Sequence, residues 1–126
     1  MVDAGVALRA AIGGLGPLAG ERLVAPPFMW AEARSALHEA TWRGEAALDD
    51  AQAALLALEQ LPVDSRSPRR LGRVAWRIAD ELGGAKTYDA EYLALAELVG
   101  GRVVTVDNRL RRGADRLGLV VLPSEL

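Results

Sequence analysis

The sequence contains no cysteine, a single histidine and, among its basic residues, a single lysine. The absence of cysteine excludes disulfides, thiolate metal sites and a thiol nucleophile. His38 lies within a predicted helix with no partner nearby, and we interpret it as a surface or interface residue. Long apolar runs and a signal-like segment are also missing, so we expect a cytoplasmic protein that does not contact membranes.

About half of the 126 residues are hydrophobic and a quarter are charged, the composition of an ordinary globular protein. A chain of this length suits a single domain, covering residues 1–126. The formal net charge of −2 argues against a generally basic nucleic-acid-binding protein. The arginines nevertheless cluster at 66–77 and 109–116, and their planar guanidinium groups suit phosphate.

Short apolar runs alternate along the chain with longer segments of helical periodicity. The predicted strands are 1–3, 23–25, 61–63, 102–107 and 119–122, and the predicted helices are 5–12, 28–43, 45–60, 68–82, 88–99 and 109–117. This alternation indicates an α/β fold, in which helices flank a central parallel sheet of about four or five short strands. Thr87 stands directly before the helix at 88–99 and is expected to cap it.

Four acidic residues occupy positions that a core-forming pattern does not explain. Asp3 and Asp107 each end a predicted strand, and sites in parallel sheets form beyond the carboxyl ends of the strands. Glu32 and Asp89 lie on helices, next to residues expected on the packed side. A carboxylate on the buried edge of a helix is costly unless it is paired or bound to a cation.

Each acid, taken alone, also has a structural interpretation. Asp107 suits the N-cap of the next helix, Asp3 suits a strand-end cap, and Asp89 stands in a first helical turn where the dipole favours an acid. Glu32 could pair with an arginine. Together, however, clustered carboxylates repel one another unless a hard cation such as Mg²⁺ or Mn²⁺ joins them. That combination is typical of metal-assisted phosphodiester hydrolysis.

Four motifs, in this order, carry a family resemblance: VDAGVAL, the APP…E helix, YDAEYLALAE and VVTVDNRL. With these motifs the chain resembles PIN-domain ribonucleases and, within them, the VapC-type toxins of bacterial toxin–antitoxin pairs. The resemblance implies an endoribonuclease that depends on Mg²⁺ or Mn²⁺ and cleaves RNA. It also implies a homodimer and a cognate VapB-like antitoxin as the inhibiting partner.

The same resemblance assigns the site residues. The metal-binding and catalytic acids are Asp3, Glu32, Asp89 and Asp107. Thr105 matches the hydroxyl residue that orients the site by hydrogen bonding. Two positions depart from the family pattern: Gly5 stands where Ser or Thr is common, and Ser35 stands where Asn is common. These departures are compatible with an alternative, a PIN-like module that binds RNA or a protein partner without cleaving.

A receiver-like signalling domain is a further alternative, because it also has an acidic pocket at strand ends. It would need a lysine that follows a strand, whereas Lys86 opens a helix, and this disfavours it. Arg109 and Arg112 follow Asp107 closely, and we expect them, with Lys86, to contact RNA phosphates.

Three further arginines and the three tryptophans occur at helical spacing. The arginines recur every four residues and form either a solvated face or an RNA-phosphate contact: Arg69, Arg73 and Arg77. The tryptophans are expected in the core or at a dimer contact rather than as a platform for RNA bases: Trp30, Trp42 and Trp76.

Overall fold

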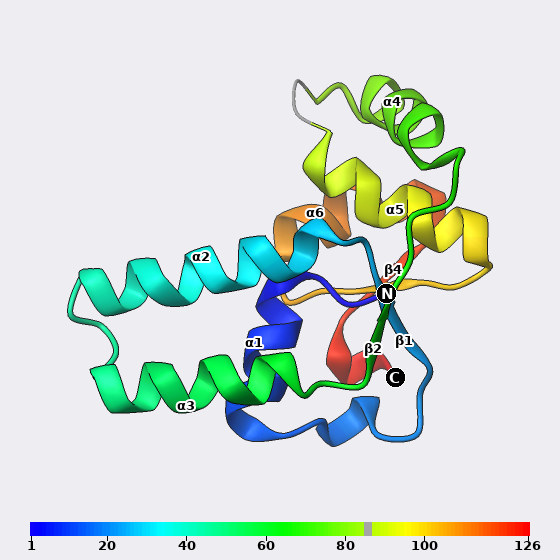
Figure 1. Ribbon diagram of the computed structural model, residues 1–126. Helices are drawn as coiled ribbons and strands as arrows, with labels where there is room; N and C mark the ends of the chain where they lie inside the picture. The colour runs from blue at the N-terminus through cyan, green and yellow to red at the C-terminus, as the bar shows by residue number, and fades with distance from the viewer. Residues whose placement is uncertain (85–86) are drawn as a thin grey trace.

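The structure is a computed structural model that describes residues 1–84 and 87–126, apart from the side chain of Arg116. The helices are α1 (Ala4–Gly13), α2 (Phe28–Trp42), α3 (Leu48–Glu59), α4 (Leu71–Leu82), α5 (Tyr88–Val99) and α6 (Asn108–Gly113). The strands are β1 (Leu23–Ala25), β2 (Val63–Ser65), β3 (Val103–Val104) and β4 (Val120–Val121). Short 3₁₀ turns are η1 (Gly16–Leu18), η2 (Asp115–Leu117) and η3 (Pro123–Glu125) (Figure 1).

The first two residues join two small parallel sheets. β1 pairs with β2, and β3 pairs with β4. Val2 forms a parallel bridge with Val104, and its N–H donates to the carbonyl of Val24 at 3.1 Å. The hydrogen bonds therefore give the order β2–β1–residues 1–2–β3–β4. This arrangement confirms the predicted α/β fold with a small sheet of short strands.

The order in which the parallel strands are added to the sheet reverses between residues 1–2 and β3. From residues 1–2 the chain proceeds outward through β1 to β2, and from β3 it proceeds to the opposite edge at β4. In open parallel sheets such a reversal is a switch point, where side chains beyond two neighbouring strand ends surround a crevice. Asp3 follows the first of these segments and Asp107 follows β3, so the fold places both at the crevice.

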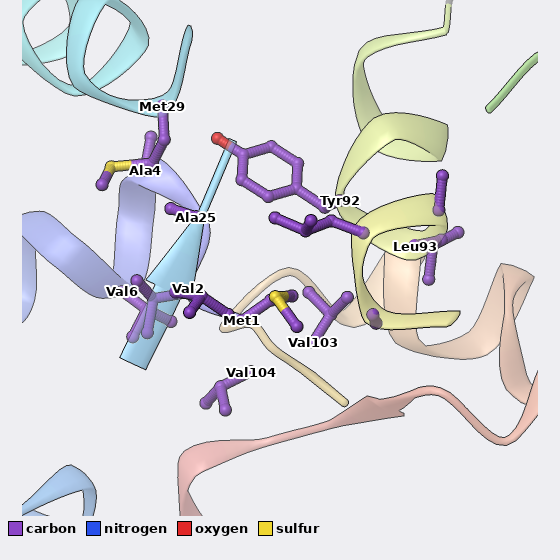
Figure 2. Close-up of a cluster of buried hydrophobic side chains, with 14 of the residues drawn as sticks. Met1, Val2, Ala4, Val6, Ala25, Met29, Tyr92, Leu93, Val103 and Val104 are labelled. Atoms are coloured by element: carbon purple, nitrogen blue, oxygen red, sulfur yellow. The ribbon is translucent and has the colours of Figure 1, made fainter. Parts of the chain in front are cut away.

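The core lies between α5, α2 and the sheet. Figure 2 shows Tyr92 of α5 extending toward Met29 of α2, with the valines of the central segments below, and these side chains and Leu93 are buried. α4 covers the outer side of α5, as Figure 1 shows. Its buried positions recur at helical spacing: Leu71, Val74, Ala75 and Ile78.

Several predicted boundaries are wrong by a few residues. The helix expected from residue 45 begins at Leu48, because Gly44 takes the left-handed φ of 75° and the chain turns before it re-enters a helix. The helix expected from residue 68 begins at Leu71. Thr87 occupies the predicted N-cap position of α5, but its backbone is in the right-handed helical region rather than extended, and its side chain makes no capping hydrogen bond.

Apart from the strand at 23–25, the predicted strands are displaced or longer than those observed. The strand expected at 61–63 lies at Val63–Ser65, and the one expected at 102–107 is limited to Val103–Val104. The helix expected at 109–117 ends at Gly113 and is followed by the separate turn η2. Within the described ranges, no helix is both long enough and apolar enough to cross a membrane.

Candidate active site

Asp3 is fixed by hydrogen bonds to both of its carboxylate oxygens. It is the N-cap of α1, where Oδ1 accepts the N–H of Val6 at 2.9 Å. Oδ2 accepts a hydrogen bond from the hydroxyl of Thr105. Burial raises the pKa of Asp3, these two hydrogen bonds lower it, and the charges of Glu32 and Asp107 raise it further. Asp3 is thus a rigidly held carboxylate within the electrostatic reach of two other acids.

Thr105 links Asp3 to Asp107. Its side chain is fully buried, and its Oγ1 also accepts the backbone N–H of Asp107 at 3.0 Å. Its own N–H donates to the carbonyl of Val121 in β4 at 3.0 Å, so the sheet fixes its position. The hydroxyl therefore faces the acids, as the alternation of side chains along this segment predicts.

Asp107 is the N-cap of α6, and capping uses only one of its two carboxylate oxygens. Its Oδ1 accepts the N–H groups of Arg109 at 2.8 Å and Leu110 at 3.3 Å. No described residue donates a hydrogen bond to its Oδ2. The capping interpretation of Asp107 is confirmed, and it is compatible with cation binding because the two roles use different oxygens.

Glu32 lies at the border of the packed face of α2 rather than on it. The prediction that its surroundings are buried is wrong: Glu32 is exposed, and Met29 and Ala33 supply the buried positions of this helix. Its Oε1 accepts a hydrogen bond from the hydroxyl of Tyr92 at 2.7 Å. Tyr92, 60 positions away in the sequence, therefore holds the Glu32 carboxylate at the edge of α2.

Sequence reasoning missed the role of Tyr92. Its side chain is 2% exposed, and the ring meets that of Phe28 edge-on at a centroid distance of 5.1 Å. Burial and the adjacent Glu32 raise the pKa of Tyr92, so its hydroxyl remains a neutral donor. The available signal was a phenol within a run of alanine and leucine, because a buried tyrosine hydroxyl normally needs a partner. Figure 2 shows this side chain extending from α5 toward α2.

Asp89 and Asp107 line one open hollow of about 450 Å³, together with Arg109. Asp89 stands in the first turn of α5. Asp89 is exposed, but partial desolvation of its carboxylate raises its pKa, the charge of Asp107 raises it further, and Arg109 lowers it. A larger cavity of about 610 Å³ lies beside η1 and β1 but contains none of the four acids, so chemistry rather than size identifies the candidate site.

The four acids form one electrostatic cluster. Asp3 is coupled to Glu32 and to Asp107, and Asp89 is coupled to Asp107. Among the residues that the structure describes, no three are arranged to ligate an ion directly. Mg²⁺ usually keeps several waters and binds through one or two carboxylates. The donor set therefore fits a hydrated cation rather than a closed protein cage.

Two of the three residues predicted to contact RNA lie in the part of the chain that the structure describes. Arg109 lines the acidic hollow, Arg112 is exposed on α6, and Lys86 lies outside the described residues. The arginine stripe is exposed, in agreement with a solvated face, although Arg69 precedes α4 and Arg77 is paired with two glutamates.

The tryptophans differ in their environments. Trp30 packs against the core. Trp42 and Trp76 are 85% and 68% exposed, so a core position is wrong for both.

The raised pKa of Asp3 predicts a pH-dependent gain in stability for Asp3→Asn. In the fold, ionised Asp3 costs stability; this cost is absent below its ordinary pKa of 3.8 and appears as pH rises through the raised value. Without metal, the variant should therefore be more stable than the wild type at neutral pH, and the difference should shrink in acid. Urea unfolding across pH measures it, with Asp49→Asn, an exposed acid in the first turn of α3, as control. A difference that is independent of pH would contradict the prediction.

Comparison with known proteins agrees with this geometry. The sequence profile of the PIN domain matches residues 3–116, a range that includes all four acids. The structure is similar to the crystal structure of PAE2754 from Pyrobaculum aerophilum, with a TM-score of 0.69 and 25% sequence identity over 98% of this chain and 88% of that chain. Among curated proteins, none matches the sequence. Because the PIN profile covers most of the sequence, the chain belongs to the PIN domain family.

Proposed function

We propose that this protein is an endoribonuclease that depends on Mg²⁺ or Mn²⁺ and hydrolyses phosphodiester bonds in RNA. PIN domains are typically metal-dependent nucleases. The proposal is supported by the links among four carboxylates from four separate segments: Thr105 hydrogen-bonds to both Asp3 and Asp107, Asp89 and Asp107 line one hollow, and Asp3 interacts electrostatically with Glu32. Interacting like charges are unfavourable unless a cation offsets them.

The available oxygens indicate which residues would hold the ion. No described residue donates a hydrogen bond to Oδ2 of Asp107 or Oε2 of Glu32. The Asp89 carboxylate likewise accepts no hydrogen bond from the described residues. When bound, the divalent cation would polarise the phosphodiester and lower the pKa of the water used in hydrolysis.

The remaining residues position these groups. Thr105 and the N-terminus of α1 hold Asp3 through both of its oxygens, and Tyr92 holds Glu32 from the core. Arg109 places a positive charge beside Asp89, where an incoming phosphate would otherwise meet only carboxylates. The chain thus supplies carboxylates held in fixed positions and the positively charged side chain of Arg109 beside them.

We further propose that the protein is the toxin of a toxin–antitoxin pair, acting in the cytoplasm as a homodimer inhibited by a VapB-like antitoxin. The toxin role rests on the resemblance of the four sequence motifs to VapC-type proteins. The dimer is further supported by several large apolar side chains that the structure leaves exposed on three helices and that an interface could cover. These side chains lie on α1, α2 and α3: Ile12, Trp42, Leu48 and Leu56.

A PIN-like module that binds RNA without cutting it is the second candidate. It is favoured by the absence of three directly ligating residues within the described ranges. It is also favoured by Gly5, where an added Cβ would lie 3.6 Å from Oδ1 of Asp3. A Ser or Thr hydroxyl at this position would stand next to Asp3, and Gly5 supplies none. The receiver-like alternative is wrong, because the chain is a PIN domain.

Cleavage of RNA by the purified protein distinguishes the two candidates. We expect a labelled single-stranded RNA to be cut in Mg²⁺ or Mn²⁺ and to remain intact in EDTA. The same ions should raise the melting temperature, since a ligand that binds only the native state stabilises it. Binding of metal and RNA without cleavage would instead support the non-cleaving module.

A further inference from the structure

Trp76 is an exposed aromatic residue that the packing of α4 does not require. The opposite face of α4 is apolar and packs on α5, whereas the Trp76 side chain is 68% exposed. One helical turn earlier stands Gly72, and a side chain there would meet open space. The indole is therefore accessible from the side of the helix start.

Unpaired arginines surround the beginning of this helix. Within the described residues, four exposed arginines have no ion-pair partner: Arg66, Arg69, Arg70 and Arg73. Arg77, by contrast, is paired with Glu81 at 2.9 Å and Glu97 at 2.5 Å. Asp80, one turn beyond Trp76, is the acid that shares this exposed line of the helix. We call the four arginines together with Trp76 the α4 basic face.

The other end of α4 reaches the candidate active site. Ala79, Leu82 and Gly84 line the same hollow as Asp89 and Asp107. At 1.5 Å per residue, Trp76 lies about 9 Å from Leu82 along the helix axis. A single-stranded nucleic acid that lies along α4 from the basic face would therefore extend toward Asp89 and Asp107.

We propose that the α4 basic face binds single-stranded RNA, with an unpaired base stacked on Trp76 and neighbouring phosphates held by Arg73 and the arginines before it. The inference rests on the proposed function, since it extends the path of the same substrate. Exposed aromatics beside arginines suit single strands, because every unpaired base offers a ring face and every nucleotide a phosphate. A duplex hides its base faces within the stack, so it fits this surface less well.

The first test measures the affinity for a fluorescent single-stranded RNA in EDTA, where cleavage does not interfere. Trp76→Ala should weaken binding between about 5-fold and 150-fold, the range expected for one stacked base. Trp76→Phe, which keeps an aromatic ring, should recover part of the loss. The matched control is Trp42→Ala, since Trp42 is even more exposed than Trp76 but lies at the end of α2, away from α4 (Figure 1).

The second test examines the phosphate contacts through salt dependence. Arg73→Ala should lower the slope of log affinity against log salt by about 0.7 for one lost phosphate contact on a single strand. Arg34→Ala, which removes an exposed arginine from α2, should leave the slope unchanged. The corresponding double-stranded RNA should compete poorly.

The outcomes separate this inference from the proposed function. If RNA is cleaved but Trp76→Ala binds it as tightly as the wild type, the inference fails and the nuclease stands. If Trp76→Ala loses binding in a protein that never cleaves, the inference stands and the nuclease fails. Equal losses in Trp76→Ala and Trp42→Ala, or a changed sedimentation coefficient in Trp76→Ala alone, would overturn the inference in favour of a protein contact.

Discussion

Asp107→Asn is expected to abolish metal-dependent RNA cleavage and leave the domain folded. Metal ions contribute several kcal/mol to such reactions, and a loss of about 4 kcal/mol corresponds to roughly a thousandfold lower rate. The cap of α6 should survive, because Oδ1 alone accepts both N–H groups and asparagine caps as well as aspartate. Removing one charge beside Asp3 and Asp89 also relieves repulsion, so the free energy of unfolding should be equal or higher.

Cleavage assays and urea unfolding, each with and without Mg²⁺, measure these effects. In the wild type, Mg²⁺ should raise the free energy of unfolding, and in Asp107→Asn this gain should be smaller. Asp49→Asn, which changes an exposed acid in α3 far from the cluster in the sequence, should behave like the wild type. Full cleavage by Asp107→Asn would leave Asp107 with the capping role alone.

Thr105→Val should reduce both stability and cleavage. The exchange keeps the shape of a fully buried side chain, but it removes the donor to Asp3 and the acceptor for the N–H of Asp107. A buried polar group left without its partner costs about 1–3 kcal/mol, so the free energy of unfolding should fall by this amount. Cleavage should fall about 10- to 100-fold in the folded fraction, as expected when the residue that orients a ligand is lost.

Two variants separate the structural effect from the functional one. Thr105→Ser retains the hydroxyl and should keep most of the activity despite a small loss of packing. Thr41→Val removes a hydroxyl that donates to the carbonyl of Leu37 within α2, so it should leave cleavage unchanged. Unchanged cleavage per folded molecule in Thr105→Val would show that the hydroxyl serves stability alone.

Local sequence patterns were sufficient for the parts of the fold that local chemistry determines. The bounds of α5 and β1 agree with the prediction. For α5 the reason is visible at Gly100, whose left-handed φ of 76° ends the helix where the sequence places glycine. For β1 it is the Pro26–Pro27 pair, which follows the strand directly.

The environment of each helix face could not be predicted in the same way. Periodicity shows which side chains share a face, but the rest of the fold decides which faces are covered. Trp76 was therefore expected in the core or at a dimer contact, although it lies on the exposed side of α4. The hydrogen bond from Tyr92 to Glu32 joins two helices that no local pattern relates, so only the structure could place it.

Residues 1–2 lie in the middle of the sheet, and this position has a consequence for the order of folding. Val2 pairs with Val104, and the hydrogen bond between Asp3 and Thr105 spans 102 positions. Contacts this distant in sequence form late, because a long loop must close before they are made. A folding intermediate that has formed its helices but lacks these contacts also lacks the link between Asp3 and Asp107. The proposed active site therefore arises only when the domain reaches its native topology, so partly folded molecules should be unable to cleave RNA.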